Sequence, residues 1–467
     1  MEGGFMTNWM SVDKIRAEFS KMMSDMYQQE VPLYGDLVEL VNDVNHVILH
    51  RDMELKEQLE ITGELPRLSQ ERHGAIRLGT ADELSNMRRV FAVMGMYPVG
   101  YYDLVPAGVP VHSTAFRAID ADSLNYSPFR VFTSLLRLEL IENADLRELA
   151  EKILANRQIF TDKALALTEK NEQQGGLDSV DAMQFVSEVL ETFRWHTNAP
   201  ISKDLYQALH DQHRLIADVV AFKGPHINHL TPRTLDIDLV QQSMSSRDIT
   251  PKAVVEGPPR RQCPILLRQT SFKALQEQVI FTDQQGSHTA RFGEIEQRGV
   301  ALTPKGRHLY DQLLEKARQR LGGVPDETNA IQYVQILEEV FQEFPDTYLE
   351  LAAKGLAYFY YYPQMKIKLL QERLWKEQDL IELIQIGKVL IKPIVYEDFL
   401  PVSAAGIFQS NLGGNEQNSY KSTSNQELFE ECLGTKVFDE IQLYAGIQKQ
   451  SIEMCLETLN NNSMVGI

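Results

Sequence analysis

Two short segments of the chain share the pattern H-x-x-x-R. One runs from His73 to Arg77 and the other from His229 to Arg233, and each has an aspartate five residues after its arginine. Side chains alternate between the faces of a β-strand, so in a strand each histidine would share a face with its arginine. A histidine can bind a metal ion and an arginine can hold a carboxylate in two hydrogen bonds. The repeat therefore predicts two histidines that meet in one cleft if the two segments pack side by side.

A third segment, Arg291–Arg298, offers carboxylates to such a cleft. Its Glu294 and Glu296 would lie on one face of a strand, about 7 Å apart. Burial of two carboxylates on one face is costly without a cation. Two neutral imidazoles and one carboxylate suit iron(II) and leave neighbouring positions open for substrate and oxygen. The spacing predicts an iron site built by His73, His229 and one of these two glutamates, and it leaves open which glutamate binds the metal.

Other histidines compete for the role of ligand, because a single histidine is more often an ordinary core or surface residue. The candidates are His112, His226 and His288. His226 lies three residues before His229, so strand alternation would place it on the opposite face. The repeat and the acidic segment together favour His73 and His229.

The arginines of the repeat also have two possible roles. Arg77 and Arg233 could form ordinary ion pairs with Asp82 and Asp236, which are near in sequence. Alternatively, the planar guanidinium of Arg77, about 13 Å from His73 along a strand, could hold a carboxylate of a small acid that reaches the metal.

Hydrophobic periodicity and turn residues divide the chain into five parts. They are N-terminal helices (1–70), a first β-rich module with His73 (71–140), a helical insertion (141–225), a second β-rich module with His229 and Glu294 (226–304), and a C-terminal helical region (305–467). Both β-rich modules have the order strand, helix, strand, strand, strand, which indicates an internal duplication. The predicted fold class is α+β, with the duplicated modules forming a central β core surrounded by the three sets of helices.

The elements expected within these parts follow the same patterns. In the first module we expect strands at 73–78, 97–104, 111–119 and 129–135 and a helix at 82–94. In the second module we expect strands at 229–233, 253–256, 265–269 and 289–302 and a helix at 235–244. Helices at 12–29 and 33–50 precede them, and the region after residue 305 is expected to be helical with one long loop at 410–426.

Composition narrows the partners and the cellular location. The formal net charge of −19 disfavours nucleic acid and anionic membranes as partners. No apolar run approaches the roughly 18 residues that span a bilayer, and the N-terminus lacks the features of a secretory signal. The three cysteines, Cys263, Cys432 and Cys455, are far apart and form no metal-binding pair. We expect a cytoplasmic protein with reduced thiols.

Two of these segments resemble strands of known metalloenzymes. Ile227–Asp238 resembles the opening strand of the vicinal-oxygen-chelate superfamily, in which the histidine binds a metal and the strand leads into a helix. Glu294–Arg298 resembles the E-x-x-Q-R strand of the hydroxyphenylpyruvate-type dioxygenases, in which the first glutamate is the ligand. The resemblance favours Glu294 over Glu296.

Nearly the whole chain resembles one family, the 2-oxoadipate dioxygenase/decarboxylases, also called hydroxyglutarate synthases. The stretches that carry the resemblance are Glu71–Arg77, Val111–Phe116, His226–Arg233, Arg291–Arg298 and Tyr396–Phe408. The family's iron(II) ligands would be His73, His229 and Glu294. Substrate would be bound by His73 and Arg77, the latter through a carboxylate, and the backbone around Val402 and Ser403, within the pocket-closing segment 396–412, would close on it.

The resemblance also implies a reaction. A 2-oxo diacid and O2 would be the small-molecule partners, and 2-oxoadipate would be oxidatively decarboxylated to 2-hydroxyglutarate with release of CO2, a step of lysine catabolism. Two alternatives stay open. One is another vicinal-oxygen-chelate metalloenzyme, such as a lyase, an isomerase or another oxo-acid dioxygenase, and the other is a non-catalytic metabolite-binding protein. Metal analysis and oxygen dependence would separate the first alternative, and ligand affinity that survives loss of the metal would separate the second.

Overall fold

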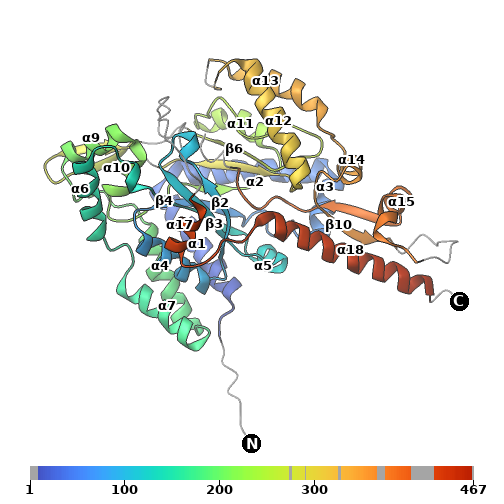
Figure 1. Ribbon diagram of the computed structural model, residues 1–467, viewed down its shortest axis with the longest axis horizontal. Helices are drawn as coiled ribbons and strands as arrows, with labels where there is room; N and C mark the ends of the chain where they lie inside the picture. The colour runs from blue at the N-terminus through green and yellow to red at the C-terminus, as the bar shows by residue number, and fades with distance from the viewer. Residues whose placement is uncertain are drawn as a thin grey trace, which may run out of the picture.

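The central feature of the fold is a five-stranded sheet with the order β2-β3-β4-β1-β5. The computed structural model describes residues 9–464 except 273–275, 290, 324, 326–327, 365–373 and 401–424. The strands of the sheet are β1 (Arg72–Leu78), β2 (Tyr97–Asp103), β3 (Val111–Arg117), β4 (Phe129–Leu136) and β5 (Leu230–Pro232). Two further strands, β6 (Leu267–Ser271) and β9 (Glu294–Arg298), form an antiparallel pair. The strands lie at the centre of the molecule with helices around them (Figure 1).

The two halves of this β core repeat one topology. In the first half, β1 is parallel to β4, β4 is antiparallel to β3, and β3 is antiparallel to β2. In the second half, Arg233 beyond β5 forms a parallel bridge with Glu296 of β9, β9 is antiparallel to β6, and Gln269 of β6 forms an antiparallel bridge with Glu256. The halves join where β1 and β5 pair antiparallel. The predicted α+β fold with duplicated modules is confirmed.

Strand β1 separates two apolar layers. Ala75 belongs to one buried cluster together with Phe132 of β4, whereas Ile76 belongs to another together with Val131. This alternation is what a strand imposes on successive side chains. His73 and Arg77 lie two residues on either side of Ala75, so they face the same layer as Ala75.

Predicted and observed elements agree closely in the first half and less well in the second. The four strands of the first half and its helix α4 (Ala81–Val93) lie within a few residues of their predicted ranges. In the second half, α11 (Ile237–Met244) is present, but the strand predicted at 253–256 is reduced to a bridge, and the one predicted at 289–302 is β9 alone. Prolines at 251, 258 and 259 lack the N–H groups that a longer ladder needs. A hairpin formed by β7 (Glu277–Ile280) and β8 (Gln285–His288) was not predicted.

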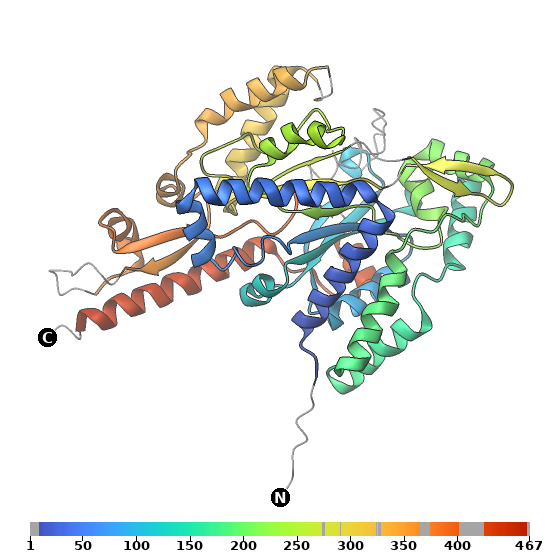
Figure 2. The same cartoon turned by 180° about the vertical axis from the view of Figure 1, so that it is seen from behind.

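Three helices precede the sheet, and the first two pack into the apolar layer of Ile76, on the face of the sheet opposite to His73. They are α1 (Val12–Glu30), α2 (Pro32–Arg51) and α3 (Met53–Ile61), and α1 begins after Ser11, whose side chain accepts a hydrogen bond from the Lys14 amide. The buried face of α1 includes Phe19, whose ring meets Phe129 of β4 with centroids 5.7 Å apart. Figure 2, which is seen from behind, shows α1 and α2 on the viewer's side of the strands.

The insertion between the halves supplies five helices. They are α6 (Ala144–Ala155), α7 (Asp162–Gln174), α8 (Ser179–Leu190), α9 (Lys203–Gln212) and α10 (Arg214–Val220). Helices α6, α9 and α10 lie together at one end of the molecule, on the left in Figure 1. Every residue of α10 from Leu215 to Val220 is buried, so this short helix is part of the core.

The C-terminal region is less purely helical than predicted. Its helices are α12 (Pro304–Leu321), α13 (Ala330–Val340), α14 (Tyr348–Ala353), α15 (Leu380–Gln385), α17 (Gln426–Leu433) and α18 (Glu440–Met464). A two-stranded antiparallel sheet, β10 (Phe359–Pro363) with β11 (Val389–Pro393), was missed because the aromatic side chains of β10 occupy both faces and hide the alternation. Across the described parts of the chain, no helix has the length and apolar character that a bilayer crossing needs.

Candidate metal centre

His73, His229 and Glu294 meet at the junction of the two halves. His73 in β1 is paired with Thr231 in β5, and His229 lies two residues before Thr231, so the antiparallel pairing brings the two imidazoles together. Their ring centroids are 5.2 Å apart. Glu294, the first residue of β9, completes a set in which one ligand atom from each of the three residues lies within 4.8 Å of the others. All three side chains are buried.

Glu294 has the contacts expected of a carboxylate that shares a cation with two histidines. Its Oε2 lies 3.0 Å from Nε2 of His73 and 3.4 Å from Nδ1 of His229. Its Oε1 is buried and has no hydrogen-bond partner among the residues described. Burial by itself would raise the pKa of Glu294, but His229 and His73 outweigh it and lower the pKa. An unsatisfied buried carboxylate oxygen beside two imidazoles fits a bound metal ion.

Thr231 connects the histidine and the carboxylate of the second half. Its hydroxyl donates to Oε2 of Glu294 at 2.8 Å and lies 3.0 Å from Nδ1 of His229. A hydroxyl that donates to Glu294 can accept from Nδ1–H of His229, which leaves the lone pair of Nε2 available to a metal. Burial lowers the pKa of His229 to about 4 against the opposing effect of Glu294, so this imidazole is neutral near pH 7, as a ligand must be.

Glu296 takes a different place from Glu294. Its Oε2 lies 2.8 Å from Nδ1 of His73, the opposite side of the ring from Glu294, although the ring is not aligned for a hydrogen bond there. Arg298 donates to both oxygens of Glu296, at 2.8 and 2.9 Å. Burial alone would raise the pKa of Glu296, but Arg298 and His73 lower it to about 2. This arrangement favours Glu294 as the ligand and Glu296 as the carboxylate that orients His73.

Behind the candidate ligands lies a buried cluster of charged side chains. Glu71, just before β1, accepts hydrogen bonds from Arg67, Arg130 and Arg233 at 2.8–3.2 Å. Glu397 accepts from Arg67 at 2.9 Å and also contacts Arg130. Because each buried charge has partners of opposite sign, the cluster can tie both halves to the C-terminal region without an isolated charge.

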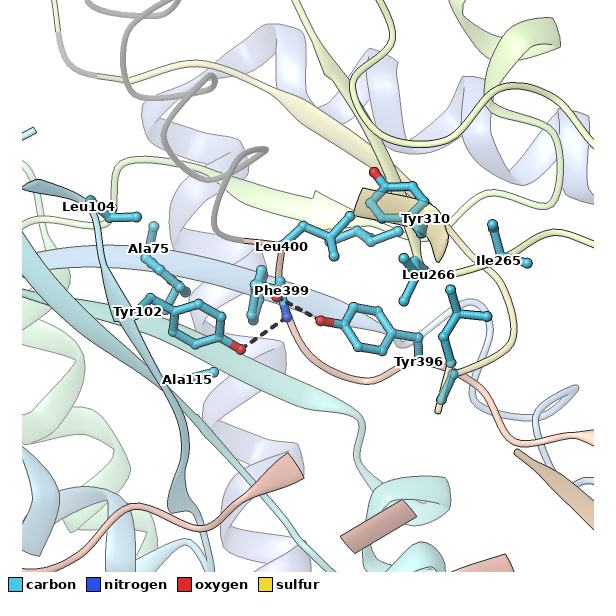
Figure 3. Packing of buried hydrophobic residues seen from close by; sticks show 14 of the residues in the cluster. Ala75, Tyr102, Leu104, Ala115, Ile265, Leu266, Tyr310, Tyr396, Phe399 and Leu400 are labelled. Atoms are coloured by element: carbon cyan, nitrogen blue, oxygen red, sulfur yellow. Dashed lines mark hydrogen bonds between the residues drawn. The ribbon is translucent and has the colours of Figure 1, made fainter. Parts of the chain in front are cut away.

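The segment before residue 401 packs directly on the candidate centre. The ring of Phe399 lies 5.0 Å from that of His73 between centroids. Two hydrogen bonds hold the Phe399 backbone, one from its amide to the hydroxyl of Tyr102 (3.2 Å) and one from the hydroxyl of Tyr396 to its carbonyl (2.7 Å), as Figure 3 shows. The two rings meet at an interplanar angle of 81°, so an apolar side chain covers one side of His73.

A charged pair fixes the same segment to the sheet. Arg117 at the end of β3 donates to both oxygens of Asp398, at 2.7 and 2.9 Å. Val402 and Ser403, which the sequence predicts to close on the substrate, lie outside the described residues. The anchored residues 396–400 bring the chain to the centre immediately before them.

The two arginines of the repeat have different partners from those near in sequence. Arg77 is buried, and its Nη1 lies 2.5 Å from Oδ2 of Asp218, on helix α10. Arg233 pairs with Glu64 at 2.7 Å and with Glu71 at 3.1 Å. Both arginines therefore form ion pairs, but with residues distant in sequence rather than with the aspartates that follow them.

The competing histidines lie elsewhere. His226 and His288 both contact Asp218, at 3.3 and 2.8 Å, and His112 packs against Phe429 with ring centroids 4.7 Å apart. Burial lowers the pKa of His112 to about 3. His226 precedes β5 (Leu230–Pro232) and lies outside the strand, so the alternation that predicts the opposite face from His229 does not apply to it.

Several residues at the site were not singled out from the sequence. Thr231 and Gln269 both donate to Glu294, the latter at 3.2 Å. Strand alternation puts Thr231 on the same face as His229, so its position near the candidate ligands could have been predicted from the sequence. Asp218 had none, because it comes from an inserted helix whose packing against β1 is not encoded in local periodicity.

Comparisons with known proteins agree with this geometry. A family model described as 2-oxoadipate dioxygenase/decarboxylase matches residues 19–411. A 2-oxoadipate dioxygenase/decarboxylase from Pseudomonas putida is 60% identical over 460 residues, covering 98% of this chain and 99% of the relative. One from Escherichia coli is 56% identical over 451 residues, covering 96% of this chain and 99% of the relative.

A solved structure shows the same overall fold. The crystal structure of the hydroxyglutarate synthase from Pseudomonas putida in complex with 2-oxoadipate has a TM-score of 0.90 and 58% sequence identity to this chain. The match covers 97% of this chain and 100% of that one.

Proposed function

Because the chain belongs to the 2-oxoadipate dioxygenase/decarboxylase family, we propose that it converts 2-oxoadipate and O2 to 2-hydroxyglutarate and CO2, as a step of lysine catabolism. The predicted assignment to a family of enzymes is confirmed by these relatives. The observation that supports the reaction most directly is the buried meeting of His73, His229 and Glu294.

The three side chains are proposed to hold iron(II). Two imidazoles and one carboxylate are a donor set typical of non-haem iron oxygenases, and bound iron would supply the activation of O2 beside the 2-oxo acid. The protein's own contribution is orientation. Thr231 fixes His229 and Glu294 relative to each other, and the charged Glu296 lies 2.8 Å from the outer nitrogen of His73.

Arg77 is proposed to bind the carboxylate of the substrate that is far from the metal. It shares a face of β1 with His73, about 13 Å along the strand, and both side chains are long enough to converge on a six-carbon diacid between them. A guanidinium can hold that carboxylate in two hydrogen bonds and so fix both ends of the substrate. Val402 and Ser403 are proposed to close on the bound substrate, because residues 396–400 lead the chain to the centre.

The direct test starts from protein stripped of metal and reloaded with iron(II) without oxygen. 2-Oxoadipate is then added, followed by O2, and products are identified by mass spectrometry. We expect one 2-hydroxyglutarate and one CO2 for each O2 consumed, in the iron-loaded protein and not in the metal-free protein.

The controls are His73→Ala and His229→Ala, which should lose iron and product together, and reloading with zinc, which should give no oxygen uptake. Oxygen-independent turnover of a 2-oxo acid would instead indicate a lyase or isomerase. Tight binding of 2-oxoadipate without turnover under any metal would indicate a metabolite-binding protein.

A further inference from the structure

A chain of buried polar side chains runs from the helical insertion to Arg77. The hydroxyl of Tyr206 on α9 lies 2.8 Å from Nδ1 of His288, and Nε2 of His288 lies 2.8 Å from Oδ1 of Asp218. The other oxygen of Asp218, Oδ2, meets Nη1 of Arg77 at 2.5 Å. His226 contacts Oδ1 of Asp218 from another side, at 3.3 Å. None of these groups is a candidate metal ligand. Only Arg77 has a role in the proposed function, which is to bind the substrate.

The contacts assign a direction to each hydrogen bond. Arg77 can only donate, so Oδ2 of Asp218 accepts. Burial raises the pKa of Tyr206 to about 12, so its hydroxyl keeps its proton and can donate to Nδ1 of His288. The imidazole of His288 then presents Nε2–H to Oδ1 of Asp218. Each oxygen of the carboxylate is thus held by a named donor, and the carboxylate has one orientation.

The surroundings make this orientation rigid. Asp218 and Arg77 are buried, and the ring of Trp195 stacks on that of His288 at an interplanar angle of 5° and meets that of His226 edge-on. Burial by itself would raise the pKa of Asp218, but Arg77, His226 and His288 hold it well below its usual range, so the carboxylate stays charged. A charged carboxylate in a fixed place holds the Nη1 end of the guanidinium that it binds and so limits where the rest of the guanidinium can lie.

We propose that Asp218, oriented by His288 and Tyr206, is a positioning residue that aims the guanidinium of Arg77 at the far carboxylate of the substrate and so contributes to the selection of diacids over monoacids. The inference rests on the proposed role of Arg77 in substrate binding. It gives the helical insertion a role in the reaction, since residues of α9 and α10 would then help to set substrate specificity by positioning Arg77 of β1.

The test compares a diacid with a monoacid of equal length in the iron-loaded protein. Asp218→Asn keeps the shape of the side chain and removes its charge. With 2-oxoadipate we expect KM to rise roughly tenfold, because the guanidinium is no longer aimed. With 2-oxohexanoate, which lacks the far carboxylate, KM should be unchanged. Calorimetry without O2 should show the same roughly tenfold weaker binding of 2-oxoadipate and no change for 2-oxohexanoate.

Tyr206→Phe provides a milder change at the other end of the chain of hydrogen bonds. It removes one hydroxyl and should raise KM for the diacid about twofold to threefold, again without an effect on the monoacid. The matched control is Asp238→Asn, which removes the charge of another carboxylate paired with an arginine, that of Asp238 with Arg268 at 2.7 Å in the second half. It should leave the ratio of the two KM values unchanged.

Two outcomes overturn the inference. One is an unchanged or lowered KM for the diacid in Asp218→Asn, and the other is an equal rise for both substrates, which a merely structural role would produce. Arg77→Lys separates this failure from that of the proposed function. If Arg77→Lys weakens binding of the diacid alone while Asp218→Asn does not, the role of Arg77 in substrate binding stands and the positioning role of Asp218 is wrong. If Arg77→Lys also treats both substrates alike, the assignment of Arg77 to the substrate is wrong.

Discussion

The two halves of the β core share a topology but have diverged in what they bring to the centre. The repeat places His73 and His229 at matching positions of β1 and β5, and each supplies one candidate ligand. The bridge of Arg233 to Glu296 matches the pairing of Arg77 with Ser134, so Ser134 stands where the second half has Glu296. By the same register, Phe132 stands where the second half has Glu294. Both halves donate a histidine, and only the second donates the carboxylates.

The arginines show the same divergence. Arg233 is held by Glu64 and Glu71 within the buried charged cluster. Arg77 meets Asp218 from the insertion, on the side of the His226 and His288 imidazoles. The two halves therefore place an arginine at equivalent positions of the same strand topology. The segments that pack around each arginine differ, so Arg233 lies in the buried charged cluster, whereas Arg77 is proposed to bind the substrate.

The largest expected effect tests whether both halves contribute to one centre. His73→Ala and His229→Ala should each lower turnover of 2-oxoadipate by roughly a thousandfold or more, because each would remove a proposed metal ligand. Metal content and O2 uptake would be measured on each variant. His46→Ala, an exposed histidine on α2, should change neither. Full iron content and activity in either ligand variant would break the equivalence of the two histidines.

The next effect separates the two arginines. Arg77→Lys keeps the charge but loses the planar fork, so KM for 2-oxoadipate should rise about a hundredfold, and the free energy of unfolding should fall as well because the buried pair with Asp218 is disturbed. Arg233→Lys should lower the free energy of unfolding by about 2–3 kcal/mol, because it disturbs a buried pair, and leave KM nearly unchanged. KM would be measured by steady-state kinetics and the free energy of unfolding by denaturant titration for both variants. An equal change of KM in the two variants would contradict different roles for the two arginines.

A smaller effect distinguishes the two glutamates of β9. Glu296→Gln should weaken iron binding by roughly 10–100-fold, since it loosens the orientation of His73, while activity at saturating iron should largely return. Glu294→Gln should not be rescued by added iron. Titration of iron against activity compares them, with Ser134→Ala as the control at the matching position of the first half. Rescue of Glu294→Gln rather than Glu296→Gln would reverse their roles.

The smallest effect is expected from a substitution that gives the second half the residue found at the matching position of the first. Ala75 in β1 stands where β5 has Thr231, two residues after each histidine. Thr231→Ala should weaken iron binding about fivefold, because the hydroxyl that joins His229 to Glu294 is worth roughly 1 kcal/mol. An unchanged dissociation constant for iron would show that the two positions are interchangeable.

Much of the first half and the meeting of the two histidines could be predicted from the sequence alone. The alternation of β1 and the H-x-x-x-R repeat predicted the strand, its facing residues and the meeting of His73 with His229, because strand periodicity is local and pairing of like modules is a simple way to bury them. The second half was read less well. Its strand at 253–256 is reduced to a bridge between prolines, and the hairpin β7–β8 has short, mostly exposed strands without clear alternation.

The amino-acid sequence by itself determined the class of fold, the duplicated frame, the two histidines and, by family resemblance, the reaction to test. Only the tertiary structure showed how the surroundings of Glu294 and Glu296 differ, because both lie on one strand face, yet Glu294 contacts both His73 and His229, whereas Glu296 contacts His73 and is held by Arg298. It alone also paired Arg77 with Asp218, 141 residues apart. Local patterns report how a segment folds, whereas the partner of a buried charge depends on which distant segment packs against it.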